Sequence, residues 1–200
     1  MRNWLLAFLV SASFTFVTAQ NFDGGFYAGM TASQIDGDAM SGYDMAGLNI
    51  GAFTQLKISE NSNFKVELAF IQKGSRDTIG STRFKLTYVE IPLIYSFRWN
   101  FLSFEIGPAL DILASSKDEG LGRTQYNQND YRRFVLNGIV GVSYHFNDTW
   151  HINFRTNNSL TPITPPTLRP AESESFYQKI MGAGWRNVIL SFGVNYTFTR

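Results

Sequence analysis

The sequence has 200 residues, with 17 Lys and Arg against 16 Asp and Glu, and it contains no cysteine. The lack of cysteine excludes a disulfide framework, a thiolate metal site and the lipid anchor of a lipoprotein, which needs an acceptor cysteine. The near-neutral charge argues against a nucleic-acid partner, because such a partner requires a clustered positive field.

The first nineteen residues have the pattern of a secretory signal peptide. Arg2 supplies one positive charge, an uncharged apolar run follows, and Val17-Thr18-Ala19 provides small or β-branched residues for cleavage after Ala19. The alternative is a membrane anchor that is retained, but the run is shorter than the roughly 20 residues of a spanning helix. We therefore predict a signal peptide at residues 1–19 and one domain over residues 20–200.

The rest of the chain alternates between apolar and small or polar residues with a period of two. From Leu102 to Ala114 one parity is apolar, whereas the other parity contains Ser103, Glu105 and Asp111. Such alternation is typical of a strand with one apolar and one polar face. The pattern recurs along the chain, and we expect eight strands, at residues 25–35, 44–58, 62–74, 82–98, 101–116, 131–146, 149–161 and 187–199.

The connections between these strands alternate in length. Three are tight turns, at Glu60-Asn61-Ser62, Trp99-Asn100 and Asn147-Asp148, and four are longer and polar, at 36–43, 75–81, 117–130 and 162–186. Because no later segment has 18 consecutive apolar residues, strands must make any membrane crossing. Short turns at one end, long loops at the other and an even strand number are typical of bacterial outer-membrane barrels. We predict an all-β fold, an eight-stranded antiparallel up-and-down transmembrane β-barrel in the outer membrane of a Gram-negative bacterium, with short periplasmic turns and longer extracellular loops.

Aromatic residues gather near the predicted tight turns. They are Tyr95, Phe97, Trp99, Phe101, Phe146, Trp150, Tyr196 and Phe198. In a barrel these residues would form the aromatic girdle at the periplasmic interface. The alternative is a soluble β-sandwich, in which one buried face per strand gives the same alternation. The sorting of the connections by length favours the barrel.

Several sequence blocks resemble the successive signatures of the PorT-like outer-membrane β-barrel family. They are Val66-Glu67-Leu68-Ala69-Phe70-Ile71-Gln72-Lys73-Gly74, Leu86-Thr87-Tyr88-Val89-Glu90-Ile91-Pro92-Leu93, Ile106-Gly107-Pro108-Ala109 and the last strand, 187–198. The resemblance implies an eight-stranded, porin-like barrel in the outer membrane, and one namesake of the family is linked to protein secretion. This chain departs from the common barrel ending on an aromatic residue, since Thr199-Arg200 follow Phe198.

The polar parity of the predicted strands carries charged residues that would meet inside the barrel. We expect a network of Lys65, Glu67, Glu90, Arg98, Glu105, Asp111, Arg133 and Arg155, with His145 and His151 on the same parity. The interior of an eight-stranded barrel is just wide enough for side chains, so opposite charges there must pair. We interpret this set as a structural network that fills the lumen, and a proton or solute relay is the alternative.

Two further patterns bear on chemistry and on strand geometry. His145 and His151 with Ser143 suggest a hydrolase triad or a metal site, but a third metal ligand is not evident and the predicted rim is the wrong one for an enzyme acting on the outer leaflet. We therefore predict no catalytic residue, no metal and no cofactor.

Pro92 falls in mid-strand, removes a backbone donor and predicts a β-bulge.

The sequence thus predicts a small outer-membrane barrel with a plugged lumen, which is structural or binds a ligand or partner through its extracellular loops. The alternatives are a narrow porin for small solutes and an accessory of a protein-secretion machine. The expected partners are outer-membrane lipid and either a cell-surface polysaccharide or a secretion-machine protein. We do not expect an enzyme.

Overall fold

The computed structural model describes residues 22–37, 42–77, 82–120, 123–125, 130–164 and 184–198. The predicted signal peptide and most of the predicted loop 162–186 lie outside these residues. Cleavage after Ala19, and with it the division into residues 1–19 and 20–200, therefore stays a prediction. Within the described residues, no helix is long and apolar enough to cross a membrane.

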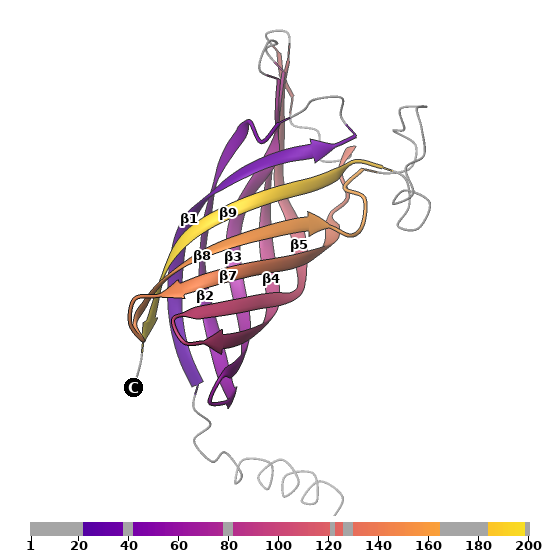
Figure 1. Cartoon of the computed structure of the whole chain (residues 1–200). Coiled ribbons are helices and arrows are strands. Elements are labelled where there is room, and N and C mark those ends of the chain that lie inside the picture. Colours follow the sequence, from indigo (N-terminus) through magenta and orange to yellow (C-terminus); the bar gives the residue numbers. More distant parts are fainter. Residues whose placement is uncertain are drawn as a thin grey trace, which may run out of the picture.

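Eight long antiparallel strands wind into a closed cylinder (Figure 1). The long strands are β1 (Phe22–Asp36), β2 (Met45–Ser59), β3 (Ser62–Arg76), β4 (Arg83–Trp99), β5 (Leu102–Gly120), β7 (Phe134–His145), β8 (Trp150–Ser159) and β9 (Arg186–Phe198), and a ninth strand, β6 (Arg123–Gln125), is short. β1 pairs with β9 from Gly24 opposite Phe198 to Asp36 opposite Arg186, and this pairing closes the sheet. The predicted eight-stranded barrel is confirmed.

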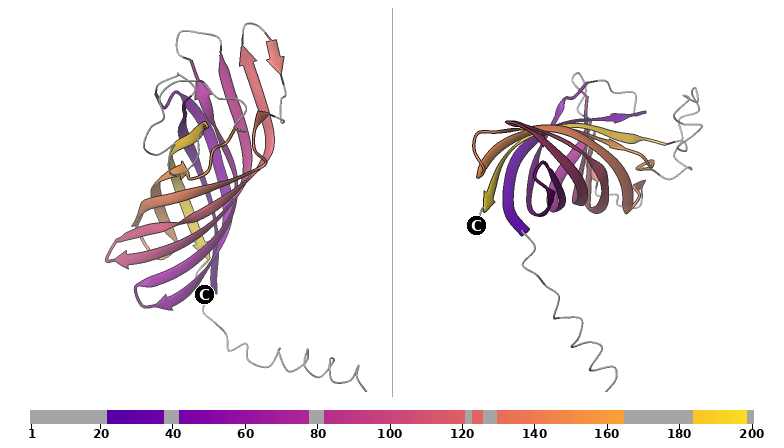
Figure 2. Two further views of the ribbon diagram at one scale, coloured as in Figure 1. Left: turned by 90° about the vertical axis from the view of Figure 1, so that its right-hand side faces the viewer. Right: turned by 60° about the horizontal axis from the view of Figure 1, so that its bottom comes forward.

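The short strand β6 is an addition to the predicted pattern. It pairs with the end of β5 and falls within the predicted loop 117–130. Three residues are too few to produce a recognisable alternation, which is why the sequence pattern did not reveal this strand. The upper ends of β3, β4 and β5, together with β6, rise above the other strands (Figure 2).

The tight turns lie at one end of the barrel, together with Phe22 and Phe198 (Figure 1). Asn100 joins β4 to β5 with φ of 57°, a left-handed conformation that asparagine tolerates better than most residues. Between β7 and β8, Asn147 Oδ1 accepts a hydrogen bond of 2.7 Å from the Trp150 amide. We call this the short-turn end and the opposite one the long-loop end.

Side chains alternate between the lumen and the outside, with the apolar parity outward. On β3, Leu68 is 58% exposed, whereas the neighbouring Glu67 is 2% exposed. The same outward apolar parity appears on the other long strands, for example at Phe104 on β5, Val140 on β7 and Phe192 on β9. A soluble sandwich would bury this apolar face against a second sheet, so the sandwich alternative is wrong.

At the long-loop end, β3 leaves β2 and approaches β1. The pairing of β3 with β2 ends at Ile71, and Thr31 Oγ1 of β1 donates to the Gln72 carbonyl at 2.8 Å. Gly47 of β2 lies beneath this crossing, where an added Cβ would be 2.5 Å from the Gln72 oxygen. Only glycine therefore fits at position 47, and β3 narrows this end of the barrel.

The bulge predicted at Pro92 is not present. Pro92 faces Ala109 in the same register that places Tyr95 opposite Ile106. In an antiparallel ladder each amide points to one neighbour, so a proline removes one bond without requiring an extra residue. The register instead shifts between Thr87 and Tyr88, where β5 contains one additional residue, Ala114.

Candidate functional site in the barrel lumen

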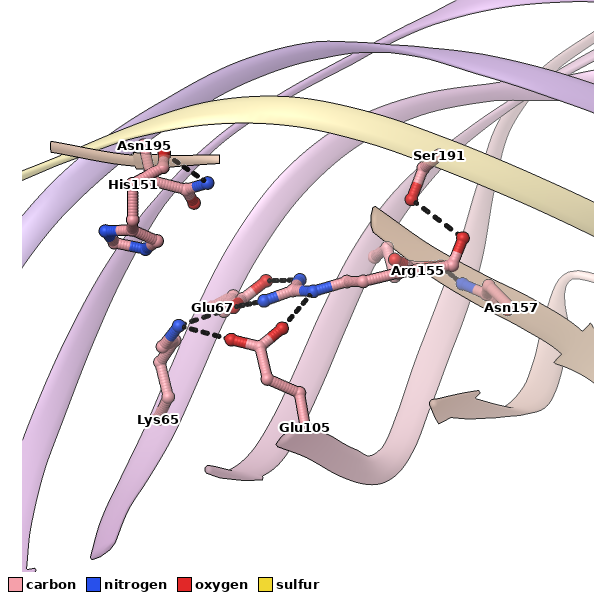
Figure 3. Close-up of polar contacts among 9 residues, drawn as sticks. Lys65, Glu67, Glu105, His151, Arg155, Asn157, Ser191 and Asn195 are labelled. Atoms are coloured by element: carbon pink, nitrogen blue, oxygen red, sulfur yellow. Dashed lines mark hydrogen bonds and ion pairs between the residues drawn. The ribbon is translucent and has the colours of Figure 1, made fainter. Parts of the chain in front are cut away.

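Four charged side chains from three strands meet in the lumen, and we call them the four-charge cluster. Arg155 of β8 donates from Nη1 and Nη2 to the two carboxylate oxygens of Glu67, at 2.8 Å each. Its Nε donates to Glu105 at 2.7 Å, and Lys65 Nζ donates to the other Glu105 oxygen at 3.0 Å (Figure 3). Two cations and two carboxylates neutralise one another, and the Arg155–Glu67 bond has the bidentate geometry of strong ion pairs.

The four-charge cluster joins opposite parts of the barrel wall. Glu67 lies on β3 and Arg155 on β8, and neither strand pairs with the other in the sheet. The Arg155–Glu67 bonds therefore cross the lumen rather than follow the wall. All four side chains are at most 5% exposed, so they fill the lumen at this level.

A second group of charges, the three-charge cluster, contains Lys73, Glu90 and Asp111. Lys73 Nζ lies 2.7 Å from Glu90 Oε2 and 2.6 Å from Asp111 Oδ2. Asn157 Nδ2 also donates to Glu90 Oε2, at 2.5 Å. Lys73 was not among the residues predicted to lie in the lumen, although it follows Lys65 and Glu67 on the inward parity of β3.

Apolar side chains fill the lumen at the long-loop end, and we call them the apolar cap. They are Ile35, Ile71, Leu86, Tyr88, Tyr131, Val135 and Ile163, with Phe84, Leu113 and Trp185 packed against them. Tyr131, Ile163 and Trp185 come from the connections rather than from the strands.

Hydrogen bonds hold these connections in the mouth of the barrel. The Arg132 amide donates to the Ile163 carbonyl at 2.7 Å, and the Ile163 amide donates to the Trp185 carbonyl at 2.8 Å. The Tyr131 hydroxyl donates to Asp118 at 3.1 Å, and burial raises the pKa of this hydroxyl. The ends of two connections thus close the lumen above the charged clusters.

The two histidines lie together near the short-turn end, but they do not engage Ser143. Their rings stack with centroids 4.7 Å apart, and His145 Nε2 is 2.7 Å from the hydroxyl of Ser103. Ser143 lies opposite Ser103 in the ladder between β5 and β7. In the described part of the chain, no group of three or more potential ligands is arranged to hold a metal ion.

The structure brings together six of the eight residues expected in the lumen network and places two elsewhere. Arg98, next to the end of β4, has a 36% exposed side chain and pairs at 3.1 Å with Asp148 of the turn after β7. Arg133 precedes β7, so the alternation of that strand does not apply to it, and it is exposed with its guanidinium 5.9 Å from the Phe134 ring. The placement of Arg98 and Arg133 in the lumen was wrong.

A known protein family has the same architecture. The family model described as outer membrane protein beta-barrel domain matches residues 18–164. The chain belongs to this family. No curated protein matches the chain.

Solved structures of other outer-membrane barrels have a similar fold. One of them is Ail, the attachment invasion locus protein of Yersinia pestis, which was solved in complex with the heparin analogue sucrose octasulfate. The Ail structure matches this chain with a TM-score of 0.51 and 12% sequence identity, and the match covers 89% of this chain and 99% of Ail. Neisserial surface protein A has a TM-score of 0.51 and 17% identity, with 88% of this chain and 96% of the other covered. At these identities the likeness shows the fold alone.

The protein is thus a small outer-membrane barrel. Its outward apolar side chains face the lipid, which explains why large residues such as Phe26, Leu68 and Val140 are more than half exposed. In barrels of this class the short turns are periplasmic and the longer loops are extracellular. The narrower membership of the PorT-like family stays a prediction.

Proposed function

We propose that this outer-membrane barrel does not conduct solutes and acts by binding a cell-surface polysaccharide at its extracellular end. The observation that carries the proposal is the lumen, which side chains fill at several successive levels. The four-charge cluster crosses it, the three-charge cluster adds a second group of buried charges, and the apolar cap fills its mouth.

A filled lumen leaves the extracellular surface as the part of the protein that is available to a partner. On that surface the ends of β3, β4 and β5, together with β6, rise above the other strands (Figure 2). Ail was solved with a sulfated sugar, and its barrel has the same strand number and closure. This likeness supports an anionic polysaccharide as the class of partner, because the sugar bound to Ail is an analogue of heparin.

The proposal assigns no enzymatic activity to the lumen. Ser103 and His145 form a hydrogen bond of 2.7 Å, but catalysis by such a pair also requires a group that orients the imidazole. Within the described residues, no hydrogen bond joins either histidine ring to a carboxylate. We assign this group a structural role at the periplasmic mouth.

Planar-bilayer recordings test the plugged lumen. We expect the purified protein to show no steady channel steps. The double variant Tyr131→Ala, Ile163→Ala removes two side chains of the apolar cap. This variant should also show no steady channel steps, because the charged clusters still cross the lumen. Steady, large steps from the wild-type protein would overturn the proposal in favour of a narrow porin.

A binding experiment on intact outer membranes tests the other half of the proposal. After crosslinking, we expect the protein to be recovered with polysaccharide and to be retained on immobilised heparin in preference to uncharged dextran. Recovery with components of a secretion machine and equal retention on both polymers would instead favour the secretion-accessory alternative.

A further inference from the structure

The three-charge cluster is buried with more negative than positive charge. The side chains of Lys73 and Asp111 are 0% exposed, and the side chain of Glu90 is 4% exposed. When all three groups are ionised, one cation faces two carboxylates, so the net charge is −1. The four-charge cluster pairs its own two cations with its own two carboxylates and cannot offset this excess. A net charge that is buried away from water is costly unless a counter-charge accompanies it.

Oxygen atoms without a hydrogen-bond partner border the three-charge cluster. Lys73 Nζ bonds to Oδ2 of Asp111, whereas Oδ1 of the same carboxylate has no partner in the described part of the chain. Asn157, which follows Arg155 on the inward face of β8, donates from Nδ2 to Glu90, and its Oδ1 also has no partner there (Figure 3). Both oxygens are buried acceptors next to a cluster that carries excess negative charge.

Two more oxygens of this kind lie at the same level of the lumen. The Tyr88 ring lies beside Lys73, with its centroid 5.5 Å from Nζ, and the Tyr88 hydroxyl lies beside the side chain of Asn187. Both residues are fully buried, and among the described residues neither the Tyr88 hydroxyl nor Asn187 Oδ1 has a hydrogen-bond partner. Unpartnered oxygens from β4, β5, β8 and β9 thus border the three-charge cluster.

A monovalent cation would satisfy the charge and the oxygens together. Its single charge equals the excess on the three-charge cluster, whereas a divalent ion would leave the cluster positive. Carboxylate, amide and hydroxyl oxygens are the ligands that hard cations prefer. A proton on Asp111 would also restore neutrality, but it would leave the oxygens of Asn157 and Asn187 without a partner.

We propose that the lumen binds one alkali-metal cation between the three-charge cluster and the apolar cap. Asp111 Oδ1 and Asn157 Oδ1 are the central ligands, and the Tyr88 hydroxyl and Asn187 Oδ1 complete the site from β4 and β9. The cation enters when the apolar cap opens. The sequence-based prediction of no metal considered histidine ligands, and the proposal departs from it. The site lies inside the barrel and does not depend on whether the extracellular end binds a polysaccharide.

Urea unfolding of the full-length mature protein in zwitterionic lipid vesicles tests the proposal. Titrations at constant pH and ionic strength compare sodium chloride, potassium chloride and calcium chloride with choline chloride, because the quaternary ammonium of choline has no exposed charge that oxygens could coordinate. The test variant is Asp111→Asn. The matched control is Asp148→Asn, which removes one exposed carboxylate near the short-turn end.

We expect sodium or potassium to raise the urea midpoint of the wild type above its value in choline. At a cation concentration ten times the dissociation constant, the rise should be roughly 0.5 M urea. Asp111→Asn should show no such rise, because Lys73 and Glu90 then balance each other. In choline this variant should be at least as stable as the wild type, since the excess charge is gone. Asp148→Asn should respond to the cations as the wild type does.

Several results would overturn the proposal. Equal wild-type midpoints in all four salts would assign the balancing charge to a proton, and a rise in calcium alone would assign it to a divalent ion. If Asp111→Asn lowers the midpoint equally in sodium, potassium and choline, Asp111 serves only as a partner of Lys73.

A second variant covers the case in which Asp111→Asn does not fold. Asn187→Ala removes one proposed ligand oxygen and no described hydrogen bond of this side chain. It should bind sodium or potassium several-fold more weakly than the wild type does, and an unchanged response would contradict the proposed site.

Discussion

The charged clusters and the apolar cap fill the same lumen by different means. The clusters consist of strand residues whose positions are fixed by the ladders, and the bonds of the four-charge cluster join strands that are not neighbours. The cap depends on Tyr131, Ile163 and Trp185, which lie in connections and are held at the mouth by hydrogen bonds of those connections. We therefore expect the middle of the lumen to unfold together with the barrel and the cap to open locally.

Substitutions in the charged clusters should cause the largest loss in the free energy of unfolding. Glu67→Ala leaves the guanidinium of Arg155 buried with only Glu105 as its partner, and breaking a buried pair typically costs about 3–5 kcal/mol. We expect a loss of this size in the free energy of unfolding, measured by urea titration of the barrel in lipid vesicles. The variant should still show no channel steps, and unchanged stability would contradict the importance of the cluster.

The outer wall provides the next comparison. Val140 lies in the middle of β7 and is 54% exposed on the outward face, so Val140→Arg would place a charge against the lipid. Its expected cost is about 2–4 kcal/mol near the bilayer midplane, whereas Val140→Leu should be close to neutral. Equal effects of the two substitutions in the same urea titration would show that this face does not meet lipid.

A change in the cap should act locally. Ile163→Ala removes buried contacts, and in a rigid core this truncation lowers the free energy of unfolding by about 2 kcal/mol or more. Here the cost should be smaller, because the connection that carries Ile163 can separate from the barrel without unfolding it. We therefore expect faster protease cleavage near residue 163 in the folded protein and a smaller change in global unfolding. If Ile163→Ala lowers global stability as much as Glu67→Ala does, the cap belongs to the cooperative unit.

The smallest effect is expected at the periplasmic rim. Asp148 is 77% exposed in its pair with Arg98, and exposed pairs contribute at most about 1 kcal/mol. Asp148→Ala should therefore change the free energy of unfolding by less than this amount. A loss comparable to that of Glu67→Ala would mean that the rim, too, is strongly coupled to the lumen.

The period-two alternation was sufficient to predict the strands and which face of each strand points outward. It could not predict the ion pairs, because Glu67 and Arg155 are 88 residues apart and their meeting depends on the register of every strand between them. Arg133 was misplaced because β7 begins only at Phe134. Tyr131 and Ile163 were missed because residues in connections follow no alternation that marks them as buried.

The bonds between Arg155 and Glu67 also bear on how the barrel forms. Glu67 on β3 precedes Arg155 on β8 by 88 residues, and contacts between segments so distant in the chain form late. Until β8 arrives, these charges have to remain in contact with water, because burying them without partners is costly. We infer that the growing sheet stays hydrated on its inner face during assembly and that closure of the cylinder expels this water in a late step.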